Sequence, residues 1–301
     1  MSGTTTFMLF RVTVEPHDDD QSYTSLREIL DDPLAEYQKM AINGARFELD
    51  GPVRRTHGIY YGTFCLIQTQ ELPPMVKAGG EPRELLAGED DDTGLGHYTS
   101  FFYDPKYEMV GVQQNRNGIS ANGVAAFFKR NYHIRSILFE VVINPAELAR
   151  LNNLTEIKSF QISIAKMENA SAFSGKSDSM AFRQVTKIAD DTNANVFTLQ
   201  FGVGYQRDAT LRKGSVIDYI RSILRKANVT DVTKIEIKGR EQDEDSLHVV
   251  DLINNKVKLI VTLPRVRQID RNYNQKIIIK AIDEYQSIVP ELQSYKIKAK
   301  Y

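Results

Sequence analysis

The stretch HYTSFFYDPKYEMVGVQQNRNGISANGVAAFFKRNY, residues 97–132, decides the fold class. Residues 97–103 and 107–113 have strand-like composition, and Asp104-Pro105-Lys106 between them suits a tight turn, so this part predicts a β-hairpin. Ser120 can cap a helix over 121–132, where apolar residues recur at helical spacing. A hairpin followed by a helix is typical of an antiparallel sheet with packed helices.

The glycines of the same stretch raise the question of a phosphate-binding loop, because a strand, a glycine-containing turn and a helix follow one another there. Such loops need two glycines five residues apart followed by Lys and Ser or Thr, or the G-x-G-x-x-G spacing. Gly118 and Gly123 are five residues apart, but Val124-Ala125 follow them instead of Lys and Ser or Thr, and the glycines do not have the G-x-G-x-x-G spacing. The missing Lys-Ser/Thr pair therefore favours a turn and a capped helix over a phosphate site.

The sequence before this stretch predicts two strands, a helix and a long loop. Residues 7–15 and 58–72 are β-branched and aromatic, and 24–40 carries apolar residues at helical spacing that a proline interrupts. Pro, Gly and acidic residues dominate 71–96, so we expect a mobile loop with at most one short helix. The adjacent acids at 89–92 lack the interleaved spacing of a metal-binding loop, so we expect them to be solvated.

The sequence after the stretch predicts further strands and helices without an internal repeat. The expected strands are 135–144, 154–167, 195–204 and 234–239, with a hairpin of 248–253 and 257–263 around Asn254-Asn255. Apolar residues alternate along the strand at 154–167, but this alternation shifts by one residue once within the strand. The expected helices are 145–153, 177–189, 211–227 and 275–293.

This pattern predicts an α+β fold with mainly antiparallel sheets, packed helices and two domains. We place the boundary near 133–136. The N-terminal α+β domain, 1–133, then contains the acidic loop 71–96, and the C-terminal α+β domain, 134–301, is basic beyond residue 200.

The composition excludes several classes of protein. The start, MSGTTTFMLFRVTVEPHDDD, lacks the basic region of a signal peptide, and no run approaches the roughly 18 apolar residues of a membrane span, so we expect no direct membrane insertion. Cys65 is the only cysteine and lies among apolar neighbours, which predicts an inert buried thiol in a cytoplasmic protein. The histidines are isolated and no GxSxG motif occurs, so the sequence predicts no catalytic residue, no metal site and no cofactor.

The net charge of −1 hides an asymmetry, because residues 1–200 carry −7 and residues 201–301 carry +6. A predicted helix within 201–228 has Arg side chains opposite its apolar face, and 263–276 (LPRVRQIDRNYNQK) is a second basic run. Such residues can lie along DNA phosphates. The candidate DNA-binding residues are Arg207, Arg212, Lys213, Arg221, Arg225, Lys226, Arg265, Arg267 and Arg271. The alternatives are a protein or subunit contact and an ordinary solvated surface.

In the order of its elements, the stretch 7–130 resembles the RexA-like phage-exclusion family. FMLFRVTVE and SLREILDD open it, followed by YYGTFCLIQTQ, the acidic-to-glycine segment LLAGEDDDTGLG, the strands of HYTSFFYDPKYEMVGVQQ and the short helix GVAAFF. The resemblance implies a bacterial antiphage-defence protein: a cytosolic dimer that binds DNA without strong sequence preference and signals to an effector. The family offers no catalytic motif to carry over.

Three hypotheses follow. In the first, the protein is a non-enzymatic, DNA-binding defence protein that forms a homodimer and has a membrane or effector protein as a further partner. In the second, it is an interaction or sensor subunit that recognises a phage or host protein through the acidic loop 88–96. In the third, it is a nuclease whose active-site carboxylates are distant in the sequence and come together only in the fold. The acidic first half confines DNA contacts to residues 205–276.

Overall fold

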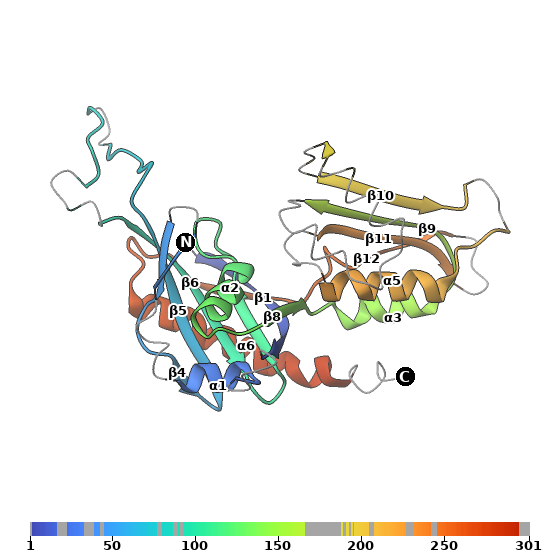
Figure 1. Ribbon diagram of the computed structural model, residues 1–301, viewed down its shortest axis with the longest axis horizontal. Helices are drawn as coiled ribbons and strands as arrows, with labels where there is room; N and C mark the ends of the chain where they lie inside the picture. Colours follow the sequence, from blue (N-terminus) through green and yellow to red (C-terminus); the bar gives the residue numbers. More distant parts are fainter. Residues whose placement is uncertain are drawn as a thin grey trace. The chain divides into compact units, whose positions relative to one another are not determined.

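The computed structural model describes residues 2–16, 23–32, 39–42, 45–76, 80–86, 90, 93–165, 188, 191–192, 194, 196–204, 208–226, 232–241 and 246–294 (Figure 1). Their contacts divide the chain into two units. The first comprises Met1–Phe139 and Lys258–Pro290, and the second comprises Glu140–Val257 and the end of the chain from Glu291. In sequence, the second unit is therefore inserted into the first.

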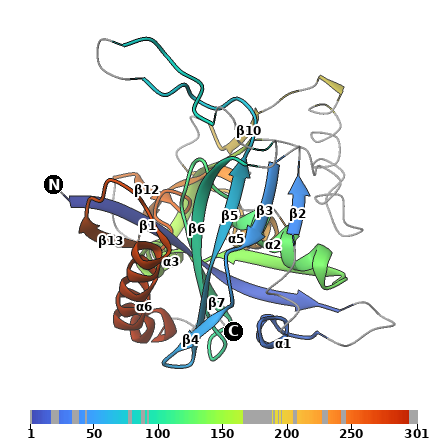
Figure 2. The same cartoon turned by 90° about the vertical axis from the view of Figure 1, so that its left-hand side faces the viewer.

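The strands of the first unit form one sheet, nine-stranded over the described residues, and Figure 2 shows its central strands side by side. Its strands are β1 (Ser2–Glu15), β2 (Lys39–Ile42), β3 (Ala45–Leu49), β4 (Arg54–Thr56), β5 (Ile59–Gln68), β6 (Leu95–Asp104), β7 (Met109–Gln113), β8 (Ser136–Val141) and β13 (Lys258–Pro264). The main path is β13-β1-β7-β6-β5-β3-β2, and its neighbours pair antiparallel. In addition, β4 pairs with β5, and β8 pairs with β1.

Helices pack on both faces of this sheet. They are α1 (Leu26–Asp31), α2 (Ala121–Asn131) and α6 (Arg271–Ser294). On one face, the Phe64 ring contacts Phe127 and Phe128 of α2, with centroids 5.0 and 6.0 Å apart. On the other face, the Phe102 ring contacts Tyr285 of α6 at 5.1 Å. Successive strand residues point to opposite faces, so the aromatic runs of β5 and β6 supply both halves of the core.

The stretch 97–132 folds as its sequence predicts. β6 and β7 form a hairpin, and the Asp104 carboxylate accepts a hydrogen bond from the backbone N–H of Lys106 at 2.9 Å within the turn. The Ser120 hydroxyl caps α2 by accepting a hydrogen bond from the N–H of Gly123 at 3.2 Å. The predicted N-cap is thus confirmed.

Close packing, rather than a phosphate site, explains the glycine of the turn before α2. The Asn115 side-chain amide donates to the Tyr98 carbonyl oxygen at 2.7 Å, which holds the turn against β6. A Cβ on Gly118 would lie 2.2 Å from Oγ1 of the buried Thr99. Only glycine allows the turn to approach the strand this closely.

Over the described residues, the second unit contains a four-stranded antiparallel sheet in the order β10-β9-β11-β12, and Figure 1 shows helices along one of its faces. Its elements are α3 (Pro145–Asn153), β9 (Leu154–Ala165), β10 (Val196–Gly202), α5 (Lys213–Lys226), β11 (Val232–Glu241) and β12 (His248–Asp251). Leu151 of α3 and Ile220 of α5 share a buried core with Ile162 and Ile235 of the sheet. One face of each element therefore supplies this core.

A β-bulge accounts for the slip of apolar phase in β9. The register pairs Lys238 with Ser159 and then Gly239 with Ile157, so Lys158 is the extra residue of the bulge on β9. The extra residue restores the apolar side chains to the core face after the bulge. The shift in the apolar pattern of the sequence therefore corresponds to a bulge in the structure.

Two predicted elements differ in the structure. The helix expected over 24–40 is confirmed only before the proline that was expected to interrupt it: α1 ends at Asp31, whereas Lys39–Ile42 forms β2, which pairs with β3. The hairpin expected around Asn254-Asn255 does not form, because β12 pairs with β11 of the second unit whereas β13 pairs with β1 of the first. Local turn chemistry favours a hairpin there, but pairing with distant strands prevails.

Two further predictions concern sparsely described segments. The predicted helix 177–189 lies outside the described residues, apart from Ile188. Within 71–96, Met75 and Arg83 form an isolated antiparallel bridge, with backbone N···O distances of 2.8 and 2.9 Å.

The fold is mixed α and β with mainly antiparallel sheets, as predicted. The division by contacts differs from the predicted boundary, because the segment from Lys258 to Pro290 packs with the first unit rather than with the residues before it. The entry and exit of the inserted segment lie side by side: the Val257 N–H donates to the Val142 carbonyl at 2.9 Å, and the Asn144 N–H donates to the Asn255 carbonyl at 3.1 Å.

Candidate nucleic-acid interface

The predicted basic residues from the sequence around α5 belong to the second unit. Arg212 is exposed, whereas the Lys213 ammonium donates to the Asn152 carbonyl at 2.6 Å and is half-buried. The remaining predictions here cannot be placed: Arg207 lies outside the described residues, and so do the side chains of Arg221, Arg225 and Lys226 on α5.

The other predicted residues, Arg265, Arg267 and Arg271, are exposed and belong to the first unit. They lie in a segment that we call the β13–α6 segment, residues 258–280. It carries six Lys and Arg against one acidic residue, Asp270. The excess of basic over acidic residues in the last third of the chain is concentrated from residue 258 onward, where the sequence has nine Lys and Arg and four Asp and Glu.

The β13–α6 segment also exposes apolar side chains. Ile260, Val266 and Ile269 are 62%, 44% and 54% exposed, whereas Leu259 and Val261 of β13 are buried. The alternation follows from the strand period, because one face of β13 packs into the core and the other does not. The segment therefore presents cations and apolar groups together.

Side chains of α6 hold the segment in place. The Lys280 ammonium donates to the Thr262 carbonyl at 2.8 Å, and the Tyr273 hydroxyl donates to the Pro264 carbonyl at 2.9 Å. The Asp270 carboxylate accepts from the Tyr273 N–H at 2.7 Å and so caps the start of α6. These hydrogen bonds join the end of β13 and the start of α6 within the segment.

Arg271, the first residue of α6, forms a bidentate ion pair with Asp50, which follows β3 in the chain. Its Nε lies 3.0 and 3.1 Å from the two carboxylate oxygens, and its Nη2 lies 2.5 Å from Oδ1. The hydrogen bonds that Arg271 donates to the Asp50 carboxylate raise the pKa of the guanidinium above its ordinary value. Near this pair, the Arg54 guanidinium donates to the Gln275 side-chain oxygen at 2.9 Å. Sequence reasoning missed Asp50, Arg54 and Gln275, because the partners lie 221 residues apart.

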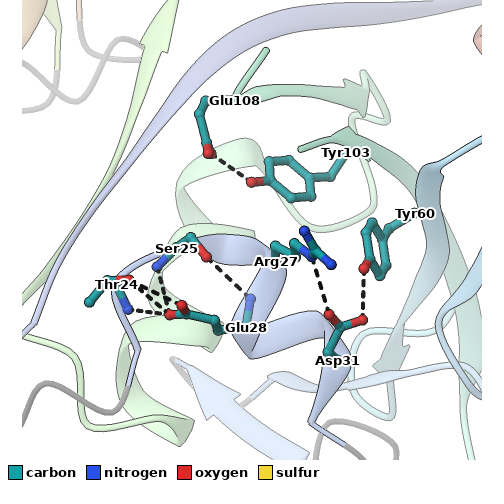
Figure 3. Close-up of polar contacts among 8 residues, drawn as sticks. All are labelled: Thr24, Ser25, Arg27, Glu28, Asp31, Tyr60, Tyr103 and Glu108. Carbon is teal, nitrogen blue, oxygen red and sulfur yellow. Dashed lines mark hydrogen bonds and ion pairs between the residues drawn. The ribbon is translucent and has the colours of Figure 1, made fainter. Parts of the chain in front are cut away.

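A second polar cluster fastens α1 to the sheet (Figure 3). The Tyr60 hydroxyl donates to Asp31 at 2.7 Å, and the Arg27 Nε lies 3.5 Å from the same carboxylate. The Tyr103 hydroxyl donates to Glu108 at 2.6 Å. Burial is the main reason that the pKa values of both tyrosines are raised, so the phenols remain hydrogen-bond donors at neutral pH.

The start of α1 is fixed by a capping box, also visible in Figure 3. The Ser25 hydroxyl accepts from the Glu28 N–H at 3.3 Å, and the Glu28 carboxylate accepts from the N–H groups of Thr24 and Ser25 at 2.6 and 3.2 Å. These backbone hydrogen bonds, chiefly that from Thr24, lower the pKa of Glu28. A six-residue helix needs such support, and we interpret the cluster as structural.

Cys65 is buried, and burial raises the pKa of its thiol to about 11, with the nearby Asp50 and Glu48 adding to the effect. Such a thiol is a poor nucleophile at neutral pH. Within the part of the chain that the structure describes, no group of three or more His, Cys, Asp or Glu could hold a metal ion. Over the same residues, no helix has both the length and the apolar character to cross a membrane.

Comparison with known proteins places the chain in a family but assigns no activity. The model of a family of unknown function, DUF6731, matches residues 36–288, so the chain belongs to that family. A search of curated proteins found no significantly similar sequence.

Proposed function

We propose that this DUF6731 protein is a non-enzymatic protein that binds DNA without strong sequence preference through the β13–α6 segment. The supporting observation is the exposure of Lys258, Arg265, Arg267 and Lys276 along a segment of the first unit with a single acidic residue. Cations on such a surface displace the counterions of DNA phosphates, which supplies affinity that does not depend on base sequence. The apolar groups beside them would exclude water from the contact.

The biological role that we propose is antiphage defence in the bacterial cytoplasm. It rests on the resemblance of residues 7–130 to RexA-like phage-exclusion proteins, from the opening strand to the helix GVAAFF. We propose with it that the protein acts as a homodimer that passes the binding signal to a membrane or effector protein. The acidic loop 71–96 is the segment that we assign to this partner, because its charge would repel DNA.

The alternative is that the protein recognises another protein instead of DNA. It is favoured by Ile260, Val266 and Ile269, which expose apolar surface among the cations of the β13–α6 segment. An acidic partner with apolar groups would fit both properties. Binding to such a partner would survive high salt better than binding to DNA, because buried apolar contact is not screened.

The test is fluorescence anisotropy with a labelled duplex of mixed sequence, at roughly 50 and 200 mM salt, the range in which phosphate contacts lose orders of magnitude in affinity. The informative variant is Arg265→Glu with Arg267→Glu. The control is Arg83→Glu with Arg116→Glu, an equal change of charge at two exposed arginines of the first unit outside the segment. We expect the first pair to weaken binding strongly and to reduce the salt slope by about 1.8.

Equal affinity of the two double variants would refute DNA binding through this segment. Charge reversal at Arg221 and Arg225 in the same assay shows whether α5 also contributes. A supercoiled plasmid incubated with the protein and Mg²⁺ tests the nuclease hypothesis, because nicking would make the protein an enzyme.

A further inference from the structure

Arg271 differs from Arg265 and Arg267 of the β13–α6 segment because an ion pair holds its guanidinium in one orientation. The side chain of Asp50 is only 9% exposed, and Arg271 is 75% exposed. A guanidinium has five N–H donors, and Asp50 engages the edge formed by Nε and Nη2. The remaining donors stay available to a ligand.

Arg54 brings a second guanidinium to the same place. It comes from β4 and donates to Gln275, which lies one helical turn beyond Arg271 on α6. Residues four apart on a helix have Cβ atoms about 5–6 Å apart, so Arg54 is held by a residue that neighbours Arg271 on α6. Arg54 is also exposed. Two positive groups are thus held by one carboxylate and one neutral amide.

We propose that Arg54 and Arg271 form a phosphate-binding site, the arginine pair, in which Asp50 and Gln275 position the guanidinium groups. The ligand class is a phosphate diester of the DNA backbone. The proposal deepens the DNA-binding function proposed above and rests on it. It extends the contact surface from the β13–α6 segment to β4, a strand for which the sequence predicted no DNA contact.

The physical argument is preorganisation. A free arginine loses side-chain entropy when it is ordered against a phosphate, whereas a guanidinium that is already fixed loses less. Asp50 lowers the local charge by one, but it is nearly buried and engages one edge of the guanidinium, so it orients Arg271 without covering its outer edge. Asp50 and Gln275 are therefore positioning residues, and the two arginines are the ligand contacts.

The test is a mutant cycle on DNA affinity with the full chain: Arg271→Ala, Asp50→Asn and the double variant, with Arg54→Ala alongside. We expect each arginine variant to weaken binding about tenfold and to reduce the salt slope by about 0.9. We expect Asp50→Asn to weaken binding less, and to have no further effect once Arg271 is absent. If Asp50 has only a structural role, Asp50→Asn should lower thermal stability. Its effect on the salt slope of DNA binding should then be the same whether or not Arg271 is present.

Several outcomes would overturn the proposal. Tighter DNA binding by Asp50→Asn would make Asp50 a competitor of the phosphate rather than a positioning residue. If the salt slope is unchanged in both arginine variants, Arg54 and Arg271 do not contact DNA phosphates. If Arg265→Glu with Arg267→Glu weakens binding while these variants do not, only the arginine pair is refuted; if none has an effect, the proposed function fails as well. Displacement of DNA by millimolar inorganic phosphate at constant ionic strength would assign the site to a free anion instead.

Discussion

Replacement of Gly111 by Ala should destabilise the first unit, because the glycine lies beneath an aromatic ring. Gly111 of β7 pairs directly with Phe102 of β6. A Cβ at position 111 would lie 2.2 Å from Cε1 and 2.3 Å from Cζ of Phe102, whereas carbon atoms in contact lie about 3.5–4.0 Å apart. Phe102 is fully buried, with the rings of Phe7 and Tyr285 at centroid distances of 6.1 and 5.1 Å. The ring therefore cannot move away without displacing its neighbours.

The expected net cost is about 2 kcal/mol. Overpacking of a dense core costs roughly 1–3 kcal/mol, and this contact belongs at the upper end because the Cβ is attached to a paired strand. The lower backbone entropy of Ala in the unfolded chain returns about 0.5–1 kcal/mol. With a urea m-value of roughly 2 kcal/mol/M, the unfolding midpoint of the first unit should fall by about 1 M.

Urea unfolding followed by circular dichroism is the suitable assay, because the chain contains no Trp to report by fluorescence. Gly214→Ala is the control, since a Cβ there meets no atom within 4 Å and the residue lies in α5. We expect the control to lose no stability. Adding Phe102→Leu to Gly111→Ala should cost less than the sum of the two single changes. A midpoint for Gly111→Ala equal to that of the original protein would refute the packing argument.

Three further predictions concern single side chains. Ser25→Ala removes the cap of α1 and should lower the free energy of unfolding by about 1 kcal/mol, measured by the same urea titration. Tyr285→Phe removes the hydrogen bond that its hydroxyl donates to buried Asp104 at 3.1 Å, and should cost about 1–3 kcal/mol. The Cys65 thiol, with a pKa of about 11 in the folded chain against the ordinary 9.0, should react with iodoacetamide at pH 8 about 100-fold more slowly than in urea. Between about pH 9 and 11 the unfolded chain releases the proton of the Cys65 thiol, whereas the folded chain keeps it. The contribution of this thiol to the free energy of unfolding should therefore be lost as the pH rises through that range.

The sequence predicted those parts of the fold that local signals determine. Ser120 caps α2 as expected, and the phase slip in the strand at 154–167 corresponds to a bulge at Lys158. The failures occur where distant pairing decides the outcome. Asn254-Asn255 has the composition of a hairpin turn, but the strand that follows pairs with β1, more than 250 residues earlier in the chain.

In the candidate interface too, local sequence predicts some features, whereas others depend on contacts between distant residues. Charge counts located a basic region in the last third of the chain, and Arg265 and Arg267 are exposed there. No local pattern could indicate that Arg271 pairs with Asp50, or that Arg54 reaches Gln275, because each contact depends on the placement of α6 beside the β3–β4 connection. Only the fold brings these side chains together.

The insertion of the second unit has a consequence for synthesis on the ribosome. β1 is translated before its partner β13, which begins only at Lys258, after the inserted residues 140–257. From Met8 to Lys258 the ribosome adds 250 residues, which takes about 12–50 seconds at roughly 5–20 residues per second. During that time, one hydrogen-bonding edge of the nascent β1 strand around residues 2–8 awaits its partner. A nascent chain that stalls before Lys258 would keep that edge open and should be a target for chaperones or for pairing with another nascent chain.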